Sequence, residues 1–103
     1  MKVIKVKNND FKAEVLDSKI PVIVDFNADW CGPCKMLGPI LETVAESHDD
    51  IKFVSVNIDD EDDLAAKYDV FSIPCLVYIK DGKEVKRNVG LLSKNELEKF
   101  IEE

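Results

Sequence analysis

The sequence predicts an α/β fold, a mixed β-sheet of five strands flanked by four helices in the order βαβαβαββα. Three observations support this. Short β-rich runs alternate with helical patterns over the first two thirds of the chain, as in parallel strands joined by helical crossovers. The dipeptide Asp81-Gly82 then joins two β-rich runs as a tight hairpin, which adds antiparallel pairing. The 103 residues suffice for one core but not two, so we expect a single domain over residues 1–103.

The first elements follow from short apolar runs and their flanking residues. Residues 3–6 are short and β-rich, which favours an opening strand. Asn9 or Asp10 can cap a short helix with apolar residues on one face. Pro21 then precedes residues 22–26, a run apolar enough for a central strand covered on both faces.

The middle of the chain continues the alternation. Apolar residues recur at helical spacing over 36–45, and Pro39 inside this pattern is expected to kink the helix. Residues 51–58 form the next β-rich run. The acidic residues 59–63 then suit the start of a helix that reaches Tyr68, because carboxylates stabilise the positive end of a helix dipole.

The last third predicts the hairpin and a closing helix. Residues 76–79 form a strand, and residues 84–89 return antiparallel after the turn. Ser93 and Glu96 have the spacing of a capping box, which opens a helix with Leu97 on its inner face.

Composition narrows the function classes. Hydrophobic residues make up 46% and charged residues 34%, a balance typical of a folded globular domain. The net charge of −7 repels phosphate backbones, so we expect no nucleic-acid partner. Lysines interrupt the apolar residues of the N-terminus, and no apolar run is long enough to span a bilayer. We therefore expect a cytoplasmic protein with no membrane association.

Two cysteines, Cys31 and Cys34, form a Cys-x-x-Cys motif between a predicted buried strand and a predicted helix start. This context is typical of redox-active cysteine pairs. The spacing places both sulfurs on one helix face, within reach of a disulfide if Cys31 lies at the helix end. Pro33 suits the first helical turn and stiffens the loop.

The two sulfurs are expected to differ. The helix dipole favours the thiolate of Cys31, whereas Cys34, one turn further in, should be more enclosed and have a raised pKa. Cys31 would then attack a substrate disulfide, and Cys34 would resolve the mixed disulfide. These roles describe a thiol–disulfide oxidoreductase.

A metal site and an inert disulfide are the alternatives. A closed zinc site needs four Cys or His ligands, and the chain offers Cys31, Cys34, Cys75 and His48 without a second ligand pair, so we expect no metal. An inert structural disulfide would close only four residues and would constrain little of the unfolded chain.

Five segments occur in the order and spacing of a known family: Val24-Asp25-Phe26, Ala28-Asp29-Trp30-Cys31-Gly32-Pro33-Cys34-Lys35-Met36, Val56-Asn57-Ile58-Asp59, Ile73-Pro74 and Val89-Gly90. Over essentially its whole length the chain resembles the thioredoxins. The resemblance implies the thioredoxin fold, with a five-stranded mixed sheet and four helices. It also implies a cis peptide bond at Ile73-Pro74 that faces the two sulfurs.

The resemblance further implies the activity and the site. A monomeric protein would reduce disulfide-containing protein substrates, and a thioredoxin reductase, a flavoprotein that draws on NADPH, would recycle it. No cofactor would be bound apart from the redox-active disulfide Cys31–Cys34, since the chain has no nucleotide-binding glycine fingerprint. Asp25 would lie beneath Cys34 and move its proton, although it could also be a structural carboxylate satisfied by hydrogen bonds. The substrate-contact residues would be Trp30, Gly32, Pro33, Ile73, Pro74 and Gly90, although simple partial burial would also explain Trp30.

Three residues depart from the family pattern. Ser55 stands where many members carry a lysine near the buried aspartate, and losing that charge should disfavour ionised Asp25. Asn27 replaces a common aromatic residue, which should loosen packing beside the active-site loop. Cys75 stands where threonine is usual, either as a small buried side chain or as a third redox thiol or site of regulatory modification.

Two other functions compete with disulfide reduction. One is oxidation or isomerisation of disulfides. The Gly32-Pro33 pair between the cysteines argues against this function, because it resembles the reducing members of the family. The other is a binding module whose contact surface serves an assembly, with the redox activity incidental.

Overall fold

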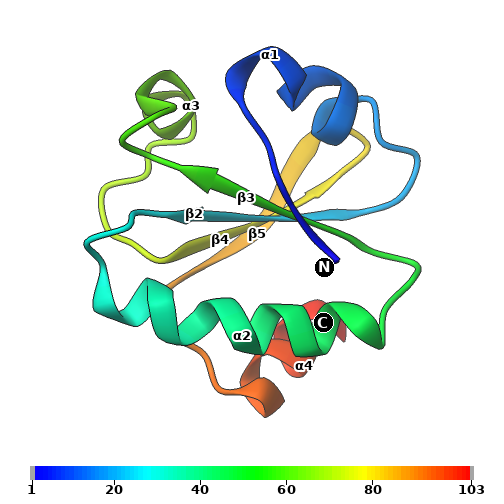
Figure 1. The fold of residues 1–103 in the computed structure, drawn as a ribbon. Coiled ribbons are helices and arrows are strands. Elements are labelled where there is room, and N and C mark those ends of the chain that lie inside the picture. The colour runs from blue at the N-terminus through cyan, green and yellow to red at the C-terminus, as the bar shows by residue number, and fades with distance from the viewer. Residues whose placement is uncertain (1, 103) are drawn as a thin grey trace.

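The computed structural model describes residues 2–102, which fold into a five-stranded mixed sheet between two layers of helices (Figure 1). The predicted fold class is therefore confirmed, and only residues 1 and 103 of the predicted domain lie outside the described range. The strands are β1 (Val3–Lys5), β2 (Val22–Asn27), β3 (Lys52–Asn57), β4 (Cys75–Lys80) and β5 (Lys83–Val89).

The strands lie in the order β1-β3-β2-β4-β5. β3 pairs in parallel with both β1 and β2, and β4 pairs antiparallel with β2 and β5. This order places β2 near the middle of the sheet, where its first five residues are buried. The apolar run that predicted a covered central strand thus has the expected position.

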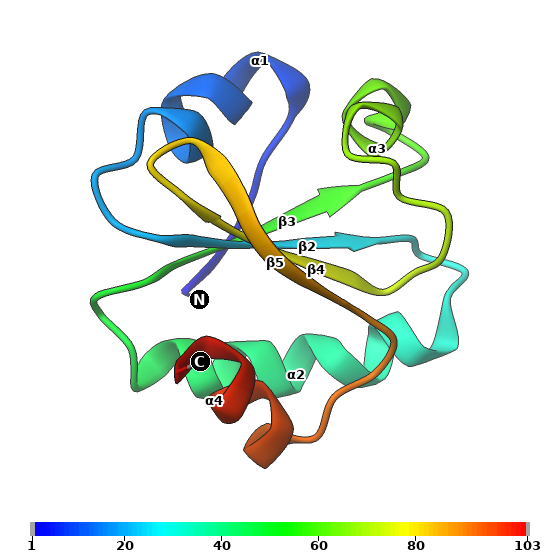
Figure 2. The same ribbon diagram turned by 180° about the vertical axis from the view of Figure 1, so that it is seen from behind.

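Helices cover both faces of the sheet (Figures 1 and 2). One face carries α2 (Gly32–Glu46) and α4 (Lys94–Glu102), and the other carries α1 (Asn8–Phe11) and α3 (Asp62–Lys67). A π-helical turn, η1 (Lys12–Leu16), continues α1. Within residues 2–102, no helix has the length and apolarity needed to cross a membrane.

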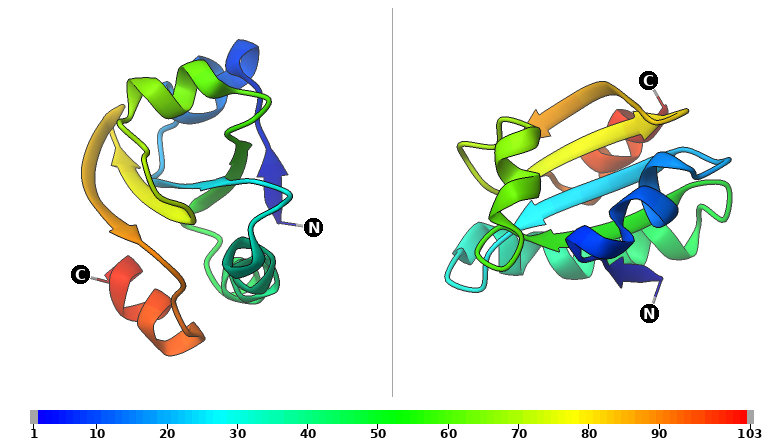
Figure 3. Two further views of the ribbon diagram at one scale, coloured as in Figure 1. Left: turned by 90° about the vertical axis from the view of Figure 1, so that its left-hand side faces the viewer. Right: turned by 90° about the horizontal axis from the view of Figure 1, so that it is seen from above.

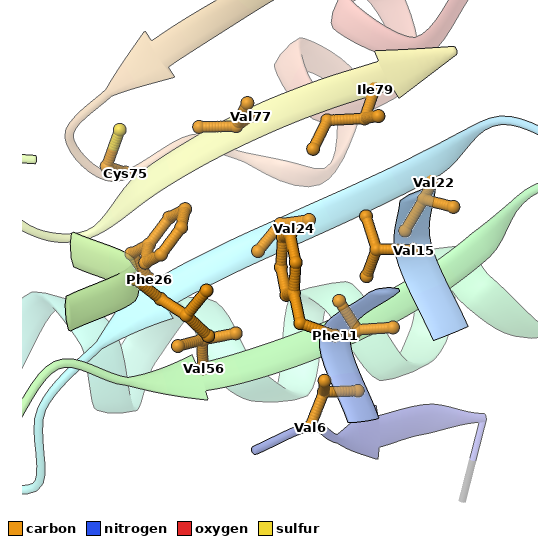
Figure 4. Packing of buried hydrophobic residues seen from close by; sticks show 12 residues of the cluster. Val6, Phe11, Val15, Val22, Val24, Phe26, Val56, Cys75, Val77 and Ile79 are labelled. Atoms are coloured by element: carbon orange, nitrogen blue, oxygen red, sulfur yellow. The ribbon is translucent and has the colours of Figure 1, made fainter. Parts of the chain in front are cut away.

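The alternation of side chains along β2 divides the core into two clusters. Val24 and Phe26 belong to the cluster on the α1 and α3 face, together with Phe11 and Leu64. Figure 3 shows these two helices on the same side of the sheet, and Figure 4 shows Val24, Phe26 and Phe11 among the buried side chains. Ile23 points to the opposite face and belongs to the cluster under α2 and α4. Asp25 alternates with Val24 and Phe26, so it lies on the α2 face.

Two predictions from short sequence patterns are confirmed, the hairpin turn after β4 and the capping box at the start of α4. The hairpin turn has positive φ at Asp81 (53°) and Gly82 (78°), as the favoured two-residue turn requires. The capping box is formed, since the Ser93 N–H donates to Glu96 Oε1 at 2.8 Å and the Glu96 N–H donates to Ser93 Oγ at 3.2 Å. Helix α2 extends through Pro39, and the kink there stays a prediction.

One predicted helix start was wrong and another was partly right. The first helix begins at Asn8, before Asn9 and Asp10, because Glu61 Oε1 accepts the Asn8 N–H at 2.7 Å in place of a local cap. Helix α3 begins with two of the predicted acidic residues, Asp62 and Asp63, in its first turn, whereas residues 59 and 60 lie in a turn before it. Asn57 Oδ1 holds this turn by accepting the N–H groups of residues 59 and 60 at 2.8 and 3.3 Å.

Candidate functional site

The cysteine pair lies where β2 gives way to α2. Cys31 is the N-cap residue, and Pro33 occupies the first turn, where its missing N–H leaves no gap in the helix ladder. Cys31 and Cys34 form a disulfide, with their Cα atoms 5.2 Å apart. The predicted pairing and its position at the helix end are thus both observed.

The helix terminus favours negative charge on Cys31. The N–H groups of the first helical turn have no backbone partner within the helix. One of them, the Cys34 N–H, donates to Cys31 Sγ at 3.2 Å. In the reduced protein the same donor and the helix dipole would stabilise a thiolate.

The expected difference in enclosure between the two cysteines was wrong for the disulfide form. Cys31 is 5% exposed and Cys34 is 7% exposed. Both cysteines are buried in a cluster with Ala28, against which Ile58 and Ile73 pack. The asymmetry of the pair therefore rests on the helix terminus and not on burial.

A loop far along the chain faces this pair. Ile73-Pro74 is a cis peptide bond, as the resemblance implied, and Ile73 packs against the cysteine cluster. The Gly90 N–H donates to the Pro74 carbonyl at 2.8 Å, which ties the end of β5 to the same loop. Three of the predicted contact residues thus come together beside the disulfide.

The exposed side of the site is apolar. Trp30 is 69% exposed, so simple partial burial does not explain it, and its Nε1–H donates to Asp59 Oδ2 at 2.9 Å. Gly32 and Pro33 are also exposed. Phe71, which was not among the predicted residues, is 90% exposed two positions before Ile73. An aromatic residue between a predicted helix and a predicted strand was the signal that could have identified it.

Asp25 lies in the middle of β2, between Ser55 of β3 and Leu76 of β4. It is 5% exposed, and burial raises the pKa of Asp25 from its ordinary value of 3.8 to about 7. A hydrogen bond from the Asn27 side chain partly offsets this increase in the pKa. Within the described part of the chain, Asp25 Oδ1 has no hydrogen-bond partner.

An open pocket of about 580 Å³ is lined by both Asp25 and Cys34. Asp25, Asn27 and Ser55 line it from the sheet, and Cys34, Gly38 and other residues line it from α2. Asp25 and Cys34 therefore border a common space, the placement that the resemblance implied.

Asn27 and Ser55, which both depart from the family pattern, form a polar network beside Asp25. Asn27 Nδ2 lies 2.8 Å from Ser55 Oγ and 3.2 Å from Asp25 Oδ2. Asn27 thus forms hydrogen bonds beside Asp25, and the looser packing expected at this position stays a prediction. The pKa of Asp25 is raised by burial and lowered in part by the Asn27 hydrogen bond, and the effect expected of the uncharged Ser55 likewise stays a prediction.

Cys75 faces away from the site. It is 1% exposed and packs with Phe26, Val77 and Ile79 in the core beneath α1 and α3 (Figure 4). Burial raises the pKa of the Cys75 thiol, which disfavours the reactive thiolate. These observations favour the structural interpretation of Cys75. Among residues 2–102 there is no group of three or more His, Cys, Asp or Glu side chains that could hold a metal ion.

The fold and the helix-terminal disulfide define an α/β domain of the dithiol–disulfide exchange class. The thioredoxin family model matches residues 2–103. The chain is 43% identical over 100 residues to thioredoxin of Haemophilus influenzae, covering 96% of this chain and 94% of the relative. It is 41% identical over 102 residues to thioredoxin of Porphyra purpurea, covering 98% and 95%. The chain belongs to the thioredoxin family.

Other relatives are longer than this chain. It is 46% identical over 93 residues to mitochondrial thioredoxin of Mus musculus, covering 89% of this chain. The matched segment spans 56% of that relative's length.

Proposed function

We propose that this protein is a protein-disulfide reductase that works by dithiol–disulfide exchange between Cys31, Cys34 and a substrate disulfide. The observation that supports this most directly is the Cys31–Cys34 disulfide at the N-terminus of α2, beside the Ile73-Pro74 loop. Family membership supports the same chemistry.

The first step is attack by the Cys31 thiolate on one sulfur of the substrate disulfide. The substrate S–S bond breaks, and a mixed disulfide forms between Cys31 and the substrate. The other substrate sulfur leaves as a thiolate and takes a proton from solvent. Cys31 suits this role because the Cys34 N–H and the helix dipole stabilise its negative charge.

The second step resolves the mixed disulfide. The Cys34 thiol loses its proton to the Asp25 carboxylate and attacks Cys31 Sγ, which displaces the second substrate thiolate. That thiolate takes up a proton, Asp25 returns its own proton to solvent, and two electrons have passed to the substrate. The common pocket of Asp25 and Cys34 supports this role, as does a pKa of Asp25 near neutrality.

Substrates would dock on the apolar surface around the disulfide. Exposed Trp30 and Pro33 would contact the polypeptide on one side, and Ile73, Pro74 and Gly90 would contact it on the other. Backbone groups of the Ile73-Pro74 loop would pair with an extended substrate segment as a strand would. Unfolded or extended segments around a disulfide are therefore the proposed substrate class.

Electrons would come from NADPH through a thioredoxin reductase, which would return two electrons and two protons to the Cys31–Cys34 disulfide. We test this with catalytic amounts of the protein, a protein disulfide, NADPH and a thioredoxin reductase. Sustained NADPH consumption that is lost in Cys31→Ser supports the proposal. Catalysis only with a small dithiol as donor would refute the reductase as partner but keep the exchange chemistry. No turnover with either donor would refute the reductase function.

We also propose that the protein acts as a cytoplasmic monomer. The Gly32-Pro33 sequence between the cysteines resembles the reducing members of the family, which suits a compartment that holds NADPH and reduced thiols. Cell fractionation tests the location, and size-exclusion chromatography with light scattering tests the monomer.

A further inference from the structure

Asn27 connects Asp25 with the neighbouring strand. Its side-chain nitrogen Nδ2 lies 3.2 Å from Asp25 Oδ2, 3.0 Å from the Asp25 carbonyl oxygen and 2.8 Å from Ser55 Oγ. One amide N–H can thus donate to Asp25 while the other donates to Ser55.

The register of the sheet makes this contact possible. Residues 25 and 27 lie two apart on β2, so their side chains share one face. Ser55 of β3 stands opposite Asp25 in the parallel register, on the same face. Ser55 Oγ therefore anchors the Asn27 amide, and the anchored amide meets the carboxyl at Oδ2 only.

The two carboxyl oxygens of Asp25 are consequently unequal. Oδ2 accepts the Asn27 hydrogen bond, whereas Oδ1 has no partner in the described part of the chain. In the proposed reaction the proton from Cys34 needs an oxygen that is free to accept it. A fixed donor on Oδ2 leaves Oδ1 for this proton.

Other groups around Asp25 can also influence its charge. Leu76 of β4, its register partner on the other side, is apolar. The charged and titratable groups that line the pocket with Asp25 or act on it through the sheet are Lys5 of β1, Asp29 after β2, Cys34, Lys35 and Glu42 of α2, and Cys75 of β4. Of all the described residues, only Asn27 makes a side-chain hydrogen bond to the Asp25 carboxyl.

We propose that Asn27, anchored by Ser55, is a positioning residue that orients the Asp25 carboxyl for proton exchange with Cys34. This inference rests on the proposed function, because it assigns a supporting residue to the proton-transfer step. Asn27 itself exchanges no proton. It acts by donating to Oδ2, which favours the carboxylate form and leaves Oδ1 without a partner among the described residues.

The test compares Asn27→Ala and Asn27→Leu with the parent protein. Leucine has the same branching of heavy atoms as asparagine but lacks the amide, so it removes the hydrogen bond without opening space. The control is Asn95→Ala, because Asn95 is exposed on α4 and does not line the pocket beside Asp25. Circular dichroism establishes that each variant is folded.

Two readouts distinguish positioning from a merely structural role. Carbon-13 NMR of the Asp25 carboxyl gives its titration midpoint without any need for activity. The pH profile of turnover with NADPH and the reductase reports the resolving step. Loss of a hydrogen bond to a charged group should move both midpoints about one pH unit higher in the two Asn27 variants. Asn95→Ala should leave both midpoints in place.

An unchanged NMR midpoint in folded Asn27→Ala and Asn27→Leu would overturn the positioning role. An NMR midpoint that moves while the turnover profile stays in place would overturn it as well, since the carboxyl would then not limit the reaction. Failure of the proposed function has a different signature, because the parent protein would then show no turnover with either electron donor. Failure of the Asp25 proton-transfer step alone would show as Asp25→Asn turning over substrate at the parent rate at every pH.

Discussion

Replacing Asp25 by asparagine should stabilise the oxidised protein, and the gain should depend on pH. Asn has nearly the size and shape of Asp but never ionises. The pKa of Asp25 is about 7 in the folded protein, against an ordinary value of 3.8 that we take for the unfolded chain. The folded state therefore holds a proton between about pH 4 and pH 7 that the unfolded state has lost.

The sign and size of the effect follow from this difference. The stabilising contribution of the bound proton is complete below the unfolded pKa of 3.8 and is lost as the pH rises through about 7. At about 1.36 kcal/mol for each pH unit of difference, the loss amounts to about 4 kcal/mol by pH 8. Asp25→Asn should thus match the parent near pH 4 and exceed its free energy of unfolding by up to about 4 kcal/mol at pH 8.

Urea unfolding of the oxidised protein at several pH values between 4 and 8.5 measures this difference. Subtracting the parent from Asp25→Asn cancels the contributions of the other carboxylates. Asp50→Asn, at an exposed position in a turn, is the matched control and should show no such trend. A parent–variant difference that stays constant across this range would show that burial does not disfavour the ionised carboxyl, and the reasoning would fail.

Three further predictions concern other parts of the molecule. Cys75 should resist a thiol reagent in the native oxidised protein and react only after denaturant is added, because it is 1% exposed; rapid native labelling would contradict this. Phe71→Ala should lower kcat/KM for a protein disulfide about five-fold, which corresponds to about 1 kcal/mol of lost apolar contact. The kcat/KM for a small aromatic disulfide should stay unchanged, and equal losses for both substrates would exclude a docking role. Gly82→Ala should lower the urea midpoint by an amount equivalent to about 1–2 kcal/mol, because φ is +78° and a Cβ would lie 3.2 Å from the Leu16 carbonyl oxygen. Gly38→Ala, in open space on α2, should raise it instead.

Features that depend on contacts between near neighbours could be predicted from the sequence. The capping box at Ser93 and the turn at Asp81-Gly82 each involve residues within three positions of one another. The same holds for the Cys31–Cys34 disulfide. For these features the pattern of residue types nearly determines the geometry, since few other conformations satisfy the same backbone groups.

Features that depend on distant segments could not be predicted in this way. The first helix begins early because Glu61, 53 residues away, caps Asn8. Cys31 and Cys34 are about equally buried, in a cluster against which the distant residues Ile58 and Ile73 pack. The exposure of Phe71 likewise depends on the tertiary path of its loop and not on the residues beside it. Predicting any of these three features would have required the order of the strands in the sheet, which the alternation of strands and helices along the chain does not specify.

The network around Asp25 combines both kinds of feature. A buried carboxyl in an apolar strand was recognisable from the sequence, and the family resemblance placed Ser55 near it. The hydrogen bonds of Asn27 to Asp25 and Ser55 were not predicted, because they depend on the β2–β3 register. A lysine at position 55 would lower the pKa of the carboxyl through its charge. The neutral amide of Asn27 supplies a weaker stabilisation, so the pKa of Asp25 stays at about 7. At neutral pH such a group is present in both protonation states, which is the condition for taking a proton from Cys34 and returning it within one cycle. Positions 27 and 55 therefore act jointly, and exchanging either residue for the common family residue should move the pH at which this site works best.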